Sequence, residues 1–251
     1  MRFQPFKFHV PSRIARRLAT YCLVLFLLNG GLGSARKTAL ADELTGPFAK
    51  EMQAFAEQDK KQPPPASAVL FVGSSSIRMW KVAESFPDLP VINRGFGGSQ
   101  ISHVLQYFDR VVTPYKPRVI VFYSGDNDVA GGKSSERVAS DFAEFLRRVH
   151  ETLPGTPVVV ISTKPSIKRW KLIETIREAN GRLAAMAKDD PLLHFVDVHP
   201  AMLNEKGEPR PELFLADGLH MNAEGYKIWT ELVRPWIEEK KKSAAAPAAA
   251  K

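Results

Sequence analysis

The stretch that decides the fold reads Ala68-Val-Leu-Phe-Val-Gly73, an apolar run that leads directly into Ser74-Ser75-Ser76. Short apolar runs that contain β-branched residues and end at a glycine are typical of buried strands. Similar runs follow along the chain at Val91–Asn93, Val119–Tyr123, Val158–Ser162 and Leu193–Val198. The sequence therefore predicts about five short buried strands.

Amphipathic stretches separate these runs and predict helices between the strands. The clearest one is Ser134–Leu153, where apolar residues recur with helical spacing on one face: Val138, Phe142, Phe145, Leu146 and Val149. Further helices are expected at 47–58, Lys171–Ala187 and Ala223–Glu239. Buried strands that alternate with helices imply a mainly parallel sheet with both faces covered.

We therefore expect one α/β domain, a three-layer α/β/α sandwich of the flavodoxin-like kind with about five parallel strands, over residues 42–239. The Lys/Ala/Pro-rich end, residues 240–251, is expected to be a disordered tail because it has almost no apolar pattern to bury. The domain is expected to be monomeric or weakly associating.

Residues 1–41 have the pattern of a cleavable export signal. Their first 17 residues are basic without an acid, the apolar run Leu18–Leu28 follows, and Ala39-Leu40-Ala41 precedes Asp42. A membrane anchor is the alternative, but a span needs about 20 consecutive apolar residues and this run is shorter. The sequence predicts cleavage after Ala41, no stable membrane span afterwards, and export to a bacterial periplasm or the cell exterior.

Removal of this signal changes the charge balance of the chain. The whole sequence has 35 Lys and Arg against 27 Asp and Glu, and seven of the basic residues but none of the acids lie in 1–41. The remaining 28 basic and 27 acidic residues give a net charge of +1. A nearly neutral domain does not favour nucleic-acid binding. The single cysteine, Cys22, leaves with the signal, so stability must come from a packed core.

Polar clusters lie where the predicted fold places ligands, beyond the carboxyl ends of the strands. Three follow the first three predicted strands, and one precedes the last helix: Ser74–Ser76, Asn93–Ser99, Ser124–Asp128 and Asp217–His220. Taken singly, serines here could cap a helix and glycines could serve a turn. A set of four in this arrangement points to a binding or catalytic site.

Together the clusters contain the parts of an acyl-transfer site. A serine hydroxyl needs an adjacent base to act as a nucleophile, and His220 is the candidate base. Asp217, three residues before it, can fix the imidazole tautomer and stabilise its cationic form. The oxyanion needs donors, which a serine N–H at a helix start, Gly98 and the side-chain amide of Asn127 can supply.

These four clusters resemble the sequence blocks of the GDSL, or SGNH, hydrolase family over roughly residues 68–236. The resemblance implies that Ser75, His220 and Asp217 form a catalytic triad, and that Ser75, Gly98 and Asn127 donate to the oxyanion. It further implies a serine esterase of lipase-like type with no cofactor and no metal. Its substrate would be a small-molecule, carbohydrate or lipid ester, with a short acyl or acetyl group.

The first block departs from the family pattern, because Ser74 stands where Gly-Asp-Ser-Ile has its aspartate. Ser75 is aligned with the nucleophile since Trp80 then falls where many members carry a tryptophan. Ser76 is the alternative nucleophile, and Ser74 is a weaker one. The absence of Gly-x-Ser-x-Gly separates the chain from the larger nucleophile-elbow hydrolases.

Other interpretations use the same clusters. The residues would also serve an O-acyltransferase, which differs only in its acceptor, or the fold could be a non-catalytic binding module. An oxygen-rich cation site is a further alternative, formed by Asp126, Asp128, Asp217 and His220.

Two further predictions concern single loops. Arg169 and Trp170, in the segment after the fourth strand, are candidate substrate contacts or ordinary surface residues. Asp197 and His199 form a rival Asp–His pair, for which we expect a packing or loop role.

Overall fold

The structure is a computed structural model that describes residues 46–244, with side chains up to Glu238. The predicted signal, residues 1–41, and most of the predicted tail, residues 245–251, lie outside the described residues. Helix α2 (Ala49–Lys61) crosses the boundary between two units, Met1–Lys50 and Glu51–Lys251. The five predicted strands and all the candidate site residues belong to the second unit.

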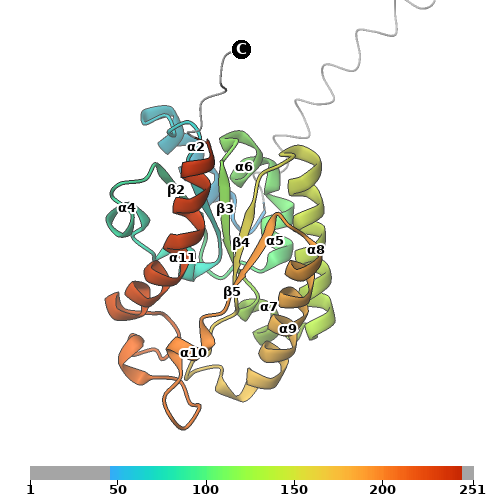
Figure 1. Cartoon of the computed structure of the whole chain (residues 1–251), viewed down its shortest axis with the longest axis vertical. Coiled ribbons are helices and arrows are strands. Elements are labelled where there is room, and N and C mark those ends of the chain that lie inside the picture. The colour runs from blue at the N-terminus through green and yellow to red at the C-terminus, as the bar shows by residue number, and fades with distance from the viewer. Residues whose placement is uncertain (1–45, 245–251) are drawn as a thin grey trace, which may run out of the picture. The chain divides into compact units, whose positions relative to one another are not determined.

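The centre of this unit is a five-stranded sheet in the order β2-β1-β3-β4-β5, with every neighbouring pair parallel (Figure 1). The strands are β1 (Val69–Gly73), β2 (Val91–Gly95), β3 (Val119–Tyr123), β4 (Val158–Ile161) and β5 (Leu193–Val196). This order is the flavodoxin-like one, in which the chain reverses its direction of winding between β1 and β3. The structure thus confirms the expected α/β class with its parallel strands.

Helices cover both faces of the sheet (Figure 1). Alternate strand residues point to opposite faces, and neighbouring residues at the end of β3 illustrate the division. Phe122 packs on Phe145 of α8 (Ser135–Thr152), with ring centroids 4.4 Å apart. Tyr123 packs on Trp229 of α11 (Ala223–Ala244), with centroids 4.7 Å apart. The β1 and β3 side chains are fully buried between these layers, which is why their sequences are continuously apolar.

Further helices complete the two layers. Helix α9 (Ile173–Asp189) packs beside α8, and α5 (Ile101–Gln106) and α6 (Phe108–Val111) lie in the same layer. The short α4 (Val82–Ser85) lies in the layer of α11 (Figure 1). Among residues 46–244, no helix is long and apolar enough to cross a bilayer.

The long helices agree with the sequence pattern to within three residues at each end, except at the C-terminal end of α11. The hydroxyl of Ser134 caps α8 by accepting a hydrogen bond from the backbone N–H of Arg137. Helix α11 continues to Ala244, whereas the sequence predicts its end at Glu239 and a disordered tail from residue 240. The Lys240–Ala244 segment consists mainly of residues with a high helix propensity, which is consistent with the longer helix.

Gly73 controls how the chain leaves the sheet. Its φ of +145° is a conformation that residues with a side chain rarely adopt, and a Cβ there would lie 1.8 Å from the carbonyl oxygen of Tyr123. The absence of a side chain lets the backbone N–H of Ser74 donate to that same carbonyl at 3.0 Å. The segment after β1 is therefore drawn tightly against the end of β3.

Candidate active site

Ser75 opens helix α3 (Ser75–Arg78), immediately beyond the carboxyl end of β1. It is 7% exposed, and its Oγ lies 3.0 Å from Nε2 of His220. The neighbouring serines have other surroundings. Ser76 Oγ accepts a hydrogen bond from Lys164 Nζ at 3.1 Å, and the buried Ser74 Oγ has no hydrogen-bond partner among the described residues. Of the three candidate nucleophiles, Ser75 is the one that the fold brings against His220.

His220 is held in turn by Asp217. The imidazole Nδ1 lies 2.5 Å from Asp217 Oδ2, while Asp217 Oδ1 accepts the backbone N–H groups of Leu219 and His220, both at 2.9 Å. The Leu219 N–H, the His220 side chain and the His220 N–H lower the pKa of Asp217 far below its ordinary value. An ionised carboxylate at Nδ1 requires the proton on that nitrogen, which leaves Nε2 free to accept from the serine hydroxyl.

The turn that carries this pair is closed by its own backbone. The Leu215 N–H donates to the His220 carbonyl at 2.8 Å, and the Gly218 N–H donates to the Leu215 carbonyl at 2.9 Å. Gly218 has a φ of +64°, the left-handed conformation that glycine adopts readily. The Asp-Gly-Leu-His sequence therefore folds back locally and brings the carboxylate and the imidazole together within one turn.

Asn127 belongs to α7 (Asp126–Ala130), which begins just after β3. Its Nδ2 donates to the carbonyl of Ser99 at 2.9 Å, and its Oδ1 accepts from Arg169 Nη2 at 2.7 Å. These two partners fix which end of the carboxamide is the donor. Gly98, next to Ser99, is exposed with a φ of +78°. The structure thus brings the loop of Gly98 and the side chain of Asn127 together at the switch point between β1 and β3.

A buried ion cluster lies beneath these groups, and the sequence did not reveal it. Lys164, only 1% exposed, reaches Ser76 Oγ, the Tyr123 hydroxyl and Asp126 Oδ2, each at 3.1 Å. Burial alone would raise the pKa of Asp126, but the positive charges of Lys164 and Arg169 outweigh it and hold that pKa below its usual value. A lysine shortly after the buried β4 run was the available signal, because buried cations are rarely left without partners.

Two of the carboxylates of the alternative cation site, Asp126 and Asp128, form ion pairs with different basic residues. Asp126 binds Lys164 and Arg169, and Asp128 binds Lys133 Nζ at 2.8 Å. Within the part of the chain that the structure describes, no three His, Cys, Asp or Glu side chains are grouped to hold a metal ion. Asp126 and Asp128 therefore serve ion pairs with basic residues.

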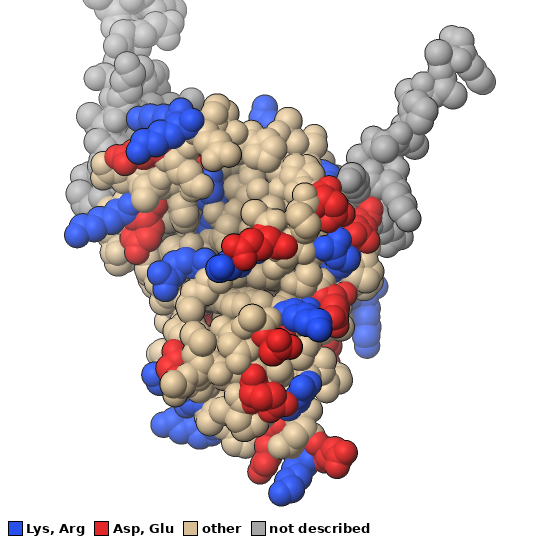
Figure 2. Space-filling view, turned by 90° about the vertical axis from the view of Figure 1, so that its left-hand side faces the viewer, with Lys and Arg blue, Asp and Glu red and all other residues tan. Residues whose placement is uncertain are grey.

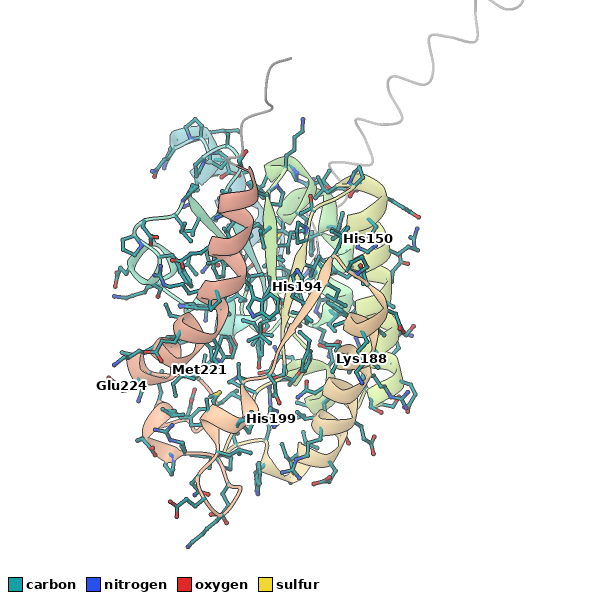
Figure 3. The ribbon with its side chains drawn as sticks, viewed as in Figure 1. His150, Lys188, His194, His199, Met221 and Glu224 are labelled. Carbon is teal, nitrogen blue, oxygen red and sulfur yellow. The ribbon has the colours of Figure 1, made fainter. Side chains whose placement is uncertain are left out.

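The rival pair at the end of β5 does not join its side chains. His199 lies at the start of α10 (His199–Met202) (Figure 3). Its Nε2 is 2.7 Å from the Thr163 carbonyl oxygen and 3.0 Å from Asn180 Nδ2. Asp197 Oδ1 instead accepts the backbone N–H of His199 and the hydroxyl of Ser162. Both residues tie the ends of β4 and β5 together.

The two candidate substrate contacts have different surroundings. Arg169 points toward Asp126 and Asn127, with its side chain 16% exposed. Trp170 is half-buried, and the guanidinium of Arg177 lies 5.7 Å from its ring centroid. A substrate role for either residue stays a prediction.

A cavity of about 570 Å³ lies between the α3–α4 segment and the start of α11. Its walls include Met79, Trp80, Met221 and Tyr226. The Tyr226 hydroxyl donates to the Ser76 carbonyl at 2.9 Å, which ties the cavity wall to the segment of Ser75. Trp80 is thus both packed in the core, 2% exposed, and part of a cavity wall. Figure 2 shows the α4 and α11 side of the molecule, where cationic and anionic side chains are interspersed.

Known proteins resemble this chain in sequence or in fold. The model of the GDSL-like Lipase/Acylhydrolase family matches residues 73–228. A GDSL-like lipase from Bacteroides thetaiotaomicron has the same fold, with a TM-score of 0.66 and 22% identity over 75% of this chain and 97% of that one. A carbohydrate esterase family 3 structure from Talaromyces cellulolyticus matches with a TM-score of 0.57 and 18% identity, over 69% of this chain and 98% of that one. No curated protein matches the chain.

Proposed function

Because the chain belongs to the GDSL-like lipase/acylhydrolase family, whose members hydrolyse ester bonds, we propose that it cleaves carboxylic esters through an acyl-enzyme on Ser75. The observation that carries this proposal is the continuous contact from Ser75 Oγ to His220 Nε2, at 3.0 Å, and from His220 Nδ1 to Asp217, at 2.5 Å. Nucleophile, base and orienting carboxylate in this sequence of contacts are what serine hydrolysis requires.

In the proposed mechanism, Ser75 Oγ attacks the ester carbonyl while His220 Nε2 takes its proton. The ionised Asp217 stabilises the imidazolium, and the N–H groups of Ser75, Gly98 and Asn127 donate to the oxyanion. His220 then returns the proton to the leaving alcohol. Water attacks the acyl-enzyme with His220 again as the base, which releases the acid and restores the serine.

Turnover of p-nitrophenyl esters from acetate to octanoate tests this function directly. A parallel incubation with a fluorophosphonate probe, followed by peptide mass spectrometry, is expected to label the peptide that contains Ser75. Product analysis with a sugar acceptor present distinguishes hydrolysis from acyl transfer. A protein that neither turns over any ester nor takes the label would contradict the proposal and favour a binding module.

For the substrate, we propose an ester with a short acyl chain, which the 570 Å³ cavity beside α3 accommodates. Its lining also contains polar and charged residues, but the part formed by Met79, Trp80 and Met221 suits the hydrocarbon part of an ester. Met79 and Met221 lie four and one residues from Ser75 and His220 in sequence. The carbohydrate esterase among the structural neighbours supports an acylated sugar as the physiological substrate.

Ala223→Trp is expected to raise KM for p-nitrophenyl octanoate about tenfold, because the indole fills a cavity position that a longer acyl chain would occupy. KM for the acetate ester is expected to change less than twofold. Ala83→Trp is the matched control, since Ala83 is an exposed residue that does not line this cavity. Equal effects on all chain lengths would place the alcohol part of the ester there instead.

We also propose that the enzyme works after export, which the basic start, the apolar run and Ala39-Leu40-Ala41 support. The protein recovered from the periplasm or medium of an expressing bacterium is expected to begin at Asp42. Its intact mass is the measurement, and an exported chain that still carries residues 1–41 would contradict cleavage.

A further inference from the structure

Arg169 lies behind Asn127 and binds the acceptor end of its carboxamide. Its Nη2 donates to Asn127 Oδ1 at 2.7 Å, a length typical of a charge-assisted hydrogen bond. At the other end of the same amide, Nδ2 donates to the Ser99 carbonyl at 2.9 Å. A carboxamide nitrogen carries two N–H bonds, so Ser99 engages one and the other can serve a ligand.

This arrangement has two physical effects on the amide. First, Arg169 has only donors, so it fixes the oxygen of Asn127 on its own side and the nitrogen on the side of Ser99 and Gly98. Second, a cation at the amide oxygen draws electron density from the nitrogen, which makes the N–H groups stronger donors. Both effects favour an oxyanion that forms near Gly98.

Arg169 is itself held by groups on two sides. Its Nη1 lies 3.1 Å from Asp126 Oδ2, and this buried carboxylate is shared with Lys164. The loop before it docks on the catalytic turn, because the Lys168 N–H donates to the Gly218 carbonyl at 3.0 Å. A Cβ at Gly218 would lie only 3.2 Å from the Cβ of Ile167, which shows how closely the two loops pack.

The buried ion cluster also carries a net positive charge. Lys164 and Arg169 are two cations that share one carboxylate, Asp126, and all three side chains are largely buried. Within this group of three side chains, one positive charge is therefore in excess. Because the group is largely buried, this charge is screened less than it would be in water, and it favours negative charge that develops on the substrate.

We propose that Arg169 is a positioning residue for the oxyanion hole: it orients and polarises the Asn127 carboxamide so that the free N–H meets the developing oxyanion. This inference rests on the proposed esterase function. It differs from the sequence prediction of Arg169 as a direct substrate contact, and the two roles give different kinetics.

Arg169→Met is expected to lower kcat roughly tenfold with KM little changed, a part of the hundredfold or greater loss typical of removing an oxyanion donor. Lys171→Met is the matched control, because Lys171 is an exposed cation two residues further along the same segment. It is expected to keep wild-type kcat and KM. A rise in KM at constant kcat in Arg169→Met would overturn the proposal in favour of a substrate contact.

A double-mutant cycle with Asn127→Ala provides the decisive comparison. If Arg169 acts through Asn127, Arg169→Met lowers kcat less than twofold once the carboxamide is gone. The same tenfold loss in both backgrounds would show that Arg169 acts independently, and would overturn the proposal. Thermal unfolding of each variant, compared with that of the wild type, excludes loss of fold as the cause.

A readout without turnover separates this inference from the proposed function. In the wild type, the Asn127 side-chain amide protons are expected to exchange slowly with solvent by NMR, and Arg169→Met is expected to speed that exchange at least tenfold. If the wild type turned over no ester but Arg169→Met still sped the exchange, the esterase proposal would be refuted and the positioning role of Arg169 would be supported. Unchanged exchange in Arg169→Met would overturn the positioning role, whatever the activity.

Discussion

Ser75→Ala is expected to lower kcat for ester hydrolysis by roughly 10⁵- to 10⁶-fold while the protein stays folded. The loss is this large because no acyl-enzyme can form, and only substrate binding and the oxyanion donors remain. The change removes one small hydroxyl that is 7% exposed, so the free energy of unfolding is expected to change by less than about 1 kcal/mol. Steady-state ester assays measure kcat, and chemical denaturation measures the free energy of unfolding.

The matched control for this variant is Ser74→Ala, one residue away. The Ser74 hydroxyl is buried without a hydrogen-bond partner in residues 46–244, so its removal costs no contact. We expect turnover within about twofold of the wild type and full fluorophosphonate labelling. Undiminished turnover in Ser75→Ala would move the nucleophile to Ser76 or Ser74.

His220→Gln is expected to cause a loss of similar size, roughly 10⁵-fold or more in kcat, because glutamine cannot take the proton from Ser75. Fluorophosphonate labelling of Ser75 is expected to slow in parallel, since it needs the same proton transfer. Asp217→Asn is expected to be milder, about 10⁴-fold, because it disturbs the imidazole tautomer but keeps the base. The labelling rate is measured by mass spectrometry over a time course, and kcat is measured by ester assay.

His150→Gln is the control for the histidine change. His150 lies on α8, and its Nε2 is 3.4 Å from Asp190. Figure 3 shows it well apart from Met221, the residue that follows His220. Its replacement is expected to leave labelling and turnover unchanged. If His220→Gln retained more than about a hundredth of the wild-type labelling rate, His220 would not be the base.

Local sequence patterns predicted most of the fold. The three inner strands, β1, β3 and β4, are buried on both faces, so their apolar runs are continuous, and the ends of β1 and β3 are indicated by Gly73 and by the polar residues that follow. The predicted end of α11 at Glu239 was wrong. The 240–244 sequence has residues of high helix propensity but no apolar periodicity, and such periodicity is the pattern on which the prediction of a helix depends. Helix ends are the least determined feature of such patterns.

In the candidate site, too, the sequence indicates the local contacts but not the long-range ones. Asp217 and His220 are three residues apart on one turn, so their contact is a local property that the sequence can show. The cluster of Lys164, Asp126 and Arg169 joins segments that are 38 and 43 residues apart, and no local pattern indicates such pairs. The same holds for the cavity, whose walls come from the α3–α4 segment and α11.

The distance along the chain between Ser75 and His220 has a consequence for when the proposed activity can arise. Ser75 and His220 are 145 residues apart, and the Tyr226 contact that ties α11 to Ser76 spans 150. Contacts of such long range form late, because the loop they close is costly in entropy. Under the proposed mechanism, a growing chain carries Ser75 long before His220, and it cannot cleave an ester until the 217–220 turn and α11 have been synthesised and have docked. Ester turnover would then indicate that these distant segments have folded together.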